Sequence, residues 1–172
     1  QELPLLSDGN EIINSFKFDQ FKKFSKNSEM VGKASFFFKA VNSIDSGDVR
    51  VSKRANVPYS RLRGFENGKI GPKDGSQFIG GNYASSLNLS STLPNILFEN
   101  ENIDLNFFVD IANVWEVDFD KSLDSNKIRS ASGIAVNWFS PIGPLTFSYA
   151  LPISEADTDV TEKFRFQIGT SF

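Results

Sequence analysis

Apolar and polar residues alternate along most of this chain with a period of two. The C-terminal segment 164–172 shows this most clearly, because Phe164, Phe166 and Ile168 fall on one face while polar or small residues occupy the other. Segments 83–93, 105–115 and 145–151 repeat the pattern. Strict alternation is the signature of a β-strand with two different faces, so the pattern predicts an all-β protein.

Seven strands are predicted, at about 11–24, 30–44, 82–94, 103–117, 128–140, 144–153 and 163–172, with a partial eighth at 1–6. Segment 10–24 could also form an amphipathic helix, but the Phe16/Phe18 spacing favours a strand. Most of these strands exceed the roughly 5–6 residues usual in soluble sheets, and they suit the ~9–11 residues of a tilted membrane strand. The connections 95–102 and 140–143 are short, whereas 45–81 is a long loop.

Alternation alone fits a soluble sandwich as well as a membrane barrel. Two features favour the barrel. The face opposite the apolar one is small and polar rather than rich in Lys and Glu, which suits a lumen. Aromatic residues also stand near predicted strand ends, as in interfacial girdles: Phe24, Tyr83, Trp115, Trp138, Tyr149 and Phe172. The sequence therefore predicts an antiparallel transmembrane β-barrel.

Composition narrows the function. The net charge is −3 with both signs mixed, so there is no basic patch for nucleic acid. With no Cys and no His, the chain cannot form a Cys/His zinc site, a thiol nucleophile or a Ser-His-Asp triad. The acidic run from Asp110 to Asp120 could suggest a cation site, but we expect Asp118 and Asp120 to lie in a solvated loop. We expect no enzyme activity, cofactor or metal.

Four motifs make the prediction more specific. Arg63-Gly64-Phe65 lies in the long loop, and segment 107–115 combines a Phe pair, Asp110 and Trp115. A hairpin with Pro141, Gly143 and Pro144 at its turn precedes a C-terminal strand that ends in Phe172. Over 59–172 these motifs resemble the sixth extracellular loop, the thirteenth strand, the last hairpin and the C-terminal β-signal of the Omp85 superfamily.

This resemblance implies that residues 1–172 form the C-terminal part of a sixteen-stranded outer-membrane barrel, contributing its last seven or eight strands. The loop at about 45–81 would then be extracellular. We expect the earlier strands and the periplasmic POTRA domains to belong to a longer protein, because the chain also begins without an initiating Met.

The function implied is that of a bacterial assembly factor, which inserts and folds outer-membrane barrel proteins through a lateral seam without using nucleotide. Its partners would be outer-membrane lipids, unfolded barrel clients and accessory lipoproteins that bind through the missing N-terminal domains. The fragment could also self-associate. Two alternatives remain: a stand-alone eight-stranded barrel serving as adhesin or structural anchor, and a two-partner secretion pore.

The resemblance assigns the first candidate site, a lock between the loop and the lumen that comprises Arg63, Gly64, Phe65 and Asp110. A guanidinium in a confined lumen needs a carboxylate, and a bidentate pair fixes its direction. Gly64 would allow an unusual backbone conformation, and Phe65 would pack the loop tip. The chain departs from the family pattern at Asn88, where a second acid is common, and at Ala112. The alternative is a solvent-exposed turn.

The second candidate site is the C-terminal strand, with Phe164, Phe166, Ile168, Gly169 and Phe172 as β-signal and lateral seam. An edge strand offers unpaired N–H and C=O groups to an incoming strand. Gly169 within this strand would weaken its packing. The alternative is a closing strand with no gate function.

Overall fold

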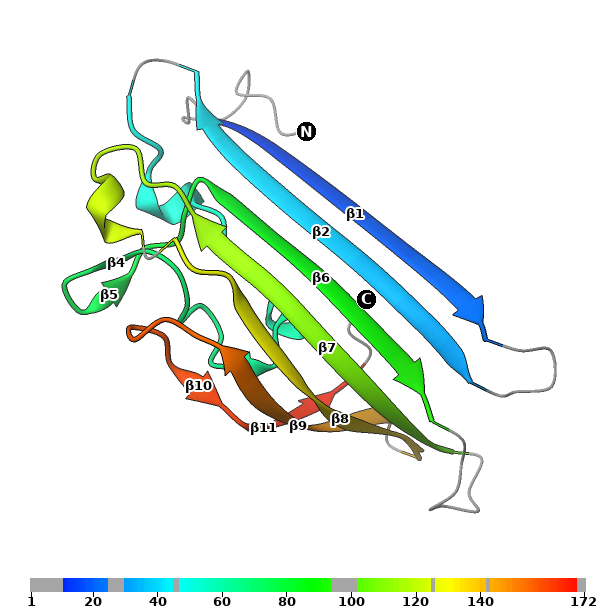
Figure 1. The fold of residues 1–172 in the computed structure, drawn as a ribbon. Coiled ribbons are helices and arrows are strands. Elements are labelled where there is room, and N and C mark those ends of the chain that lie inside the picture. The colour runs from blue at the N-terminus through cyan, green and yellow to red at the C-terminus, as the bar shows by residue number, and fades with distance from the viewer. Residues whose placement is uncertain are drawn as a thin grey trace.

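The computed structural model describes residues 11–24, 30–44, 47–93, 102–124, 126–141 and 143–169. Its main feature is one antiparallel sheet of seven strands in the order β1-β2-β6-β7-β8-β9-β11 (Figure 1). The strands are β1 (Glu11–Lys23), β2 (Val31–Ser43), β6 (Tyr83–Thr92), β7 (Ile103–Trp115), β8 (Arg129–Ser140), β9 (Gly143–Ser154) and β11 (Phe164–Ile168).

The seven predicted strands are present, with ends shifted by one or two residues in most cases. Segment 11–23 is a strand and not a helix. The described part of the last strand ends at Ile168, where Gly169 follows with φ +96°, and residues 170–172 of the predicted strand are outside the described ranges. Residues 1–6 and Phe172 lie outside the described part of the chain. Among the described residues, no helix is long and apolar enough to cross a membrane.

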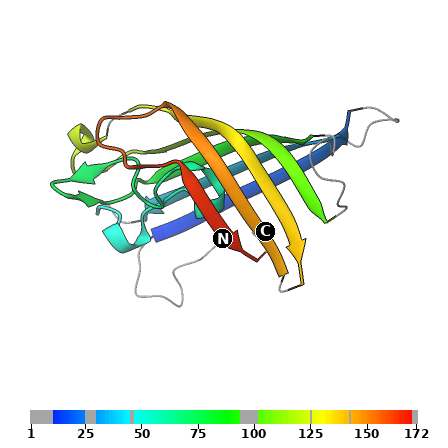
Figure 2. The same cartoon turned by 90° about the horizontal axis from the view of Figure 1, so that it is seen from below.

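The sheet curves into a trough whose two edges are β1 and β11 (Figure 2). Large apolar side chains cover the outer, convex face, where Phe16, Phe107 and Ile168 are 56%, 45% and 70% exposed. The inner face holds buried polar side chains instead, among them Ser35, Asp110 and Arg165. This is the reverse of a soluble protein and places the convex face against lipid. The fold is that of an antiparallel transmembrane β-barrel, present in part.

Aromatic side chains gather at one end of the outer face. Phe38, Tyr83 and Trp115 come from three neighbouring strands, and their ring centroids lie 5.7 to 6.4 Å apart. Trp138 lies near the opposite end, at the end of β8. Tyr149 was wrongly placed by the sequence, because it sits in the middle of β9. Two ends of the sheet can thus be distinguished: a long-loop end near Tyr83 and a short-turn end near Trp138.

The connection between β2 and β6 folds over the inner face of the sheet. Its described part, residues 47–82, is the long loop. It contains two single-turn helices, η2 (Val51–Lys53) and η3 (Tyr59–Arg61), and the short strands β3 (Gly64–Phe65), β4 (Lys73–Asp74) and β5 (Gln77–Phe78). β3 pairs with β10 (Thr161–Glu162), which precedes the last strand. A third such helix, η4 (Lys121–Leu123), follows β7.

The main apolar core lies between the long loop and the sheet. Val57, Leu62 and Phe65 of the loop are 7%, 5% and 1% exposed. They form one cluster with inward-facing residues of β2, β6, β7 and β8, such as Phe37 and Ala131. Burial of this apolar area favours the docked loop. The loop is therefore part of the core and holds a fixed position inside the trough.

Candidate functional site

Arg63 and Asp110 form a bidentate ion pair on the inner face of β7. Nε of Arg63 donates to Oδ2 of Asp110 over 2.7 Å, and Nη2 donates to Oδ1 over 2.8 Å. The backbone N–H of Arg63 also donates to Oδ2, at 3.1 Å. The Asp110 side chain is fully buried, while that of Arg63 is 19% exposed. One carboxylate thus fixes both the side chain and the backbone of the loop at this residue.

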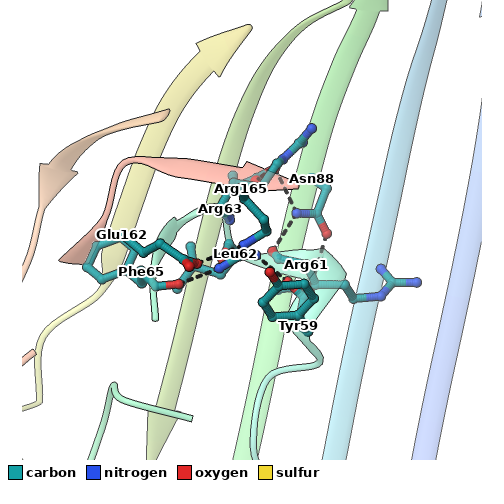
Figure 3. Close-up of polar contacts among 10 residues, drawn as sticks. Tyr59, Arg61, Leu62, Arg63, Phe65, Asn88, Glu162 and Arg165 are labelled. Atoms are coloured by element: carbon teal, nitrogen blue, oxygen red, sulfur yellow. Dashed lines mark hydrogen bonds and ion pairs between the residues drawn. The ribbon is translucent and has the colours of Figure 1, made fainter. Parts of the chain in front are cut away.

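Asn88 occupies the position directly across from Asp110 on β6. Its Nδ2 donates to Oδ1 of Asp110 at 2.9 Å and to the backbone oxygen of Arg61 at 2.6 Å. Figure 3 shows Asn88 beside the loop residues Arg61 and Arg63. Where the family resemblance implies a second acid for Arg63, this chain has an amide that supports the carboxylate and holds the loop backbone. Sequence reasoning missed this role.

Phe108 and Gly133 shape the surface on which Arg63 rests. The guanidinium carbon of Arg63 lies 3.3 Å from the centroid of the fully buried Phe108 ring, in a cation–π arrangement. A Cβ built on Gly133 of β8 would lie 2.7 Å from the Phe108 ring and 2.0 Å from the backbone oxygen of Tyr149. Gly133 therefore leaves the space that the ring fills. Neither residue was among the predicted site residues.

Gly64 brings the loop backbone against the wall of the trough. Its φ is +89°, a conformation that favours glycine. An added Cβ would lie 2.9 Å from the Cβ of Ala131 and 3.4 Å from that of Ala150. Phe65 follows as a buried member of the core. Ala112, the other departure from the family pattern, is also buried in this core.

Gly64→Ala is expected to loosen the loop more than Gly68→Ala. Gly68 has φ +68°, but an added Cβ there would meet nothing within 4 Å, so Gly68→Ala adds backbone strain alone. Gly64→Ala adds contact with Ala131 to a similar strain, and we expect it to cost about 1–3 kcal/mol in loop docking. Protease cleavage rates within the long loop measure the difference. Equal rates for the two variants would contradict the close approach at Gly64.

Arg129 and Asp159 form a second ion pair, with both side chains fully buried. Nε and Nη2 of Arg129 donate to the Asp159 carboxylate at 2.8 and 2.9 Å, and Nη1 donates to the side-chain oxygen of Asn113 at 2.8 Å. The Ala156 N–H also donates to Asp159. The pair ties the connection after β9 to the start of β8. No local sequence motif predicts this ion pair, because Arg129 and Asp159 are thirty residues apart.

The sequence suggested that Asp118 lies in a solvated loop, but the structure shows it bound to the long loop. It accepts hydrogen bonds from the Val49 N–H at 2.9 Å and from Nη2 of the buried Arg54 at 3.0 Å. Burial raises the pKa of Asp118, but these hydrogen bonds, one from Asn82 and the Arg54 charge bring that pKa below its ordinary value. Asp118 therefore anchors the beginning of the long loop. Asp120 accepts from Ser122 at the start of η4.

No group of three or more Asp or Glu side chains within the described residues is arranged to hold a metal ion. The acidic run therefore consists of separate contacts. Asp110 binds Arg63, and Asp118 binds Arg54. Oε1 of Glu116 lies 3.4 Å from Nζ of Lys121.

β11 is an edge strand with two different backbone sides. The Ala150 N–H of β9 donates to the Lys163 oxygen, and the Gly169 N–H donates to the Pro144 oxygen at the other end. Because antiparallel bonding alternates, the intervening residues that bond to β9 are the odd-numbered ones. The N–H and C=O groups of Phe164, Phe166 and Ile168 therefore point to the open edge, and their side chains face outward.

The predicted hairpin joins β8 to β9. Gly143 has φ +119° and pairs with Ser140, whose hydroxyl donates to the Gly143 oxygen at 2.6 Å. Pro141 lies in the turn, and Pro144 pairs with Phe139. Gly169 follows β11 directly and its N–H still donates to the Pro144 oxygen of β9, so the weaker packing expected at this glycine stays a prediction.

Comparisons with known proteins agree with this architecture. The model of the Omp85 superfamily domain matches residues 5–172. The outer membrane protein assembly factor BamA of Neisseria meningitidis serogroup B is 30% identical, over 64% of this chain and 17% of its own. The protein of the same name from Neorickettsia risticii is 29% identical, over 66% of this chain and 16% of its own.

A solved structure is also similar. The crystal structure of BamA from Haemophilus ducreyi lacking POTRA domains 1–3 superposes with a TM-score of 0.84 and 28% sequence identity. The match covers 92% of this chain and 35% of that one. The chain thus spans about a sixth of the length of the curated relatives.

Proposed function

The chain belongs to the Omp85 superfamily, and on this basis we propose that it is the C-terminal part of the barrel of an outer-membrane protein assembly factor. Its relatives place it in the bacterial outer membrane. The proposed activity is insertion and folding of client barrel proteins. Outer-membrane lipids, unfolded clients and accessory lipoproteins bound through further domains are its proposed partners.

The observation that carries this proposal is the open edge of β11. The strand is only five residues long and pairs with β9 alone among the described strands. Its outward-pointing backbone groups at Phe164, Phe166 and Ile168 can add a further strand by β-augmentation. We propose that this edge is one side of a lateral seam. A client strand that pairs there would exchange its hydrogen bonds with water for ladder bonds, so the work comes from client folding and requires no nucleotide.

The loop–lumen lock supports the proposal from inside the trough. The long loop is held against β7 by Arg63 and Asp110 and against β10 by the β3 pairing. β10 leads directly into β11, the red edge strand of Figure 2, so the loop is held next to the strand that carries the open edge. The lock would therefore keep the lumen side of the seam rigid while the edge receives a strand.

The seam can be tested by removing one donor from the open edge. Phe166→Pro deletes an N–H that points away from β9, so the β9–β11 ladder keeps its bonds while the edge loses its central donor. Phe166→Ala controls for loss of the aromatic ring. In the complete protein that carries this chain, we expect client insertion into vesicles to slow by about tenfold with Phe166→Pro relative to Phe166→Ala, as expected from a lost ladder bond.

Equal insertion rates for the two variants would count against the seam. A folding control accompanies both variants, namely heat-resistant mobility in gels and β-content by circular dichroism.

The stand-alone barrel alternative is less well supported, because the seven described strands leave both edges of the sheet open.

A further inference from the structure

Arg165 is the second residue of β11; its side chain points inward and reaches the backbone of the long loop (Figure 3). The residue is 2% exposed. Nη1 donates to the carbonyl oxygens of Tyr59 and Leu62, and Nη2 donates to that of Phe65. Nε donates to the Glu162 carboxylate at 3.1 Å. One side chain of the last strand therefore binds three carbonyls of a segment about a hundred residues earlier.

The guanidinium also stacks on the loop. Its central carbon lies 3.9 Å from the centroid of the Tyr59 ring. Planar stacking combined with a fork of donors is specific to arginine, since a lysine ammonium has neither the plane nor the fixed donor directions. The contact thus fixes both the distance and the orientation of β11 relative to the loop.

The three carbonyls lie on both sides of Arg63 in the sequence. Residues 59–65 are therefore held from two directions at once: by Asp110 of β7 through Arg63, and by β11 through Arg165. β11 itself is held by only a five-residue ladder to β9. A buried arginine with four acceptors is a large share of what keeps so short an edge strand in place.

We propose that Arg165 is a positioning residue that couples the long loop to the seam strand. β11 cannot move away from the lumen without withdrawing the guanidinium from its carbonyls, and the loop cannot shift without releasing β11. A strand that pairs with the open edge and tilts β11 would therefore act on the Arg63–Asp110 lock through Arg165. This inference rests on the proposed function for its purpose, but the coupling itself can be measured without clients.

The test uses hydrogen–deuterium exchange of the complete protein in lipid vesicles. With Arg165→Ala, we expect the amides of residue 165, Gln167 and Gly169, which point toward β9, to exchange at least about tenfold faster, because a charge-assisted network has been removed. Amides of β1 and β2 should be unchanged. Arg165→Lys should recover only part of the protection. Gln167→Ala is the matched control, since Gln167 lies on the same face of β11, two residues further on, and lines an inner-face pocket together with Asn88 and Thr146.

A crosslink provides an independent rescue. The Glu66 N–H bonds to the Val160 oxygen, and both side chains are exposed. These 172 residues contain no cysteine, so Glu66→Cys with Val160→Cys places one disulfide within them, which ties the loop to the segment before β11. If Arg165 acts by holding these parts together, the oxidised pair restores slow exchange of the amides of residues 165, 167 and 169 in Arg165→Ala, and reduction reverses the effect.

Two results would overturn the coupling: unchanged exchange of β11 in Arg165→Ala, or faster exchange that spreads equally to β1 and β2. The latter would mean general loss of stability. Failure of the proposed function has a different signature. Exchange of β11 would rise as expected and the disulfide would suppress it, but neither change would alter client insertion.

Discussion

Asp110→Ala is expected to release the long loop and to cost about 3–5 kcal/mol, because it leaves the Arg63 guanidinium without its carboxylate inside the trough. The substitution removes all four hydrogen bonds that converge on the carboxylate, three from Arg63 and one from Asn88. Urea unfolding in lipid and trypsin cleavage after Lys53 and Lys69 would measure the effect. Both readouts should change together.

Asp19→Ala is the matched control. Asp19 also lies on the inner face, on β1, but its nearest cation, Lys33, is 4.0 Å away and both side chains are 42% exposed. A pair this open contributes little. Similar losses for Asp19→Ala and Asp110→Ala would show that any inner-face carboxylate has the same effect, and the lock would lose its support.

Exchanging the two charges should restore only part of the docking. In Arg63→Asp with Asp110→Arg the ion pair can re-form, but the amide of Asn88 would then face a cation, and the bond from the residue 63 N–H would be lost. We expect the double variant to be more stable than either single variant and less stable than the original. A double variant no better than the worse single variant would contradict a direct pairing.

Arg129→Ala is the second substitution with a large expected effect. Both members of its ion pair are fully buried, and Arg129 also binds Asn113 and the Lys127 carbonyl. Breaking such a pair strands the Asp159 carboxylate and is expected to cost about 3–5 kcal/mol in unfolding free energy. Lys121→Ala breaks a pair that is 79% and 38% exposed and should cost little.

The place where protease cleavage begins distinguishes loss of the Arg129–Asp159 pair from loss of the Arg63–Asp110 pair. Arg129→Ala should expose the connection 155–160 to protease first, because Asp159 and the Ala156 N–H are bound there. Arg63 and its partners should remain protected. If cleavage began instead in the long loop, the two ion pairs would form a single cooperative unit rather than separate anchors.

The strands could be predicted because the alternation of apolar and polar residues is a local property of each segment. The C-terminal strand was predicted to continue to Phe172, and its described part runs from Phe164 to Ile168, because residues 170–172 lie outside the described part of the chain. The pairing of Arg63 with Asp110 came from a family resemblance and not from spacing. Nothing local in the sequence connects two residues that are 47 positions apart.

The remaining site residues depend on register. Asn88 meets Asp110 only because β6 and β7 are aligned so that these two residues are opposite, and a shift by one residue would turn Asn88 to the lipid side. The absence of a side chain at Gly133 likewise matters only because Phe108 is its partner across β7 and β8. Inward polar residues on adjacent strands are the signal that would identify such partners, once the pairing is known.

The separation between the long loop and its last contact has a consequence for the order of folding. Tyr59, Leu62 and Phe65 are 100 to 106 positions away from Arg165. Contacts of such high contact order form late, because most of the chain must be ordered before they meet. The long loop precedes most of the strands in the sequence, but its contacts are complete only after β11 has joined the sheet. We therefore expect the Arg165 contacts to be among the last to form, and a molecule that lacks its final strand to keep a loop that proteases cleave.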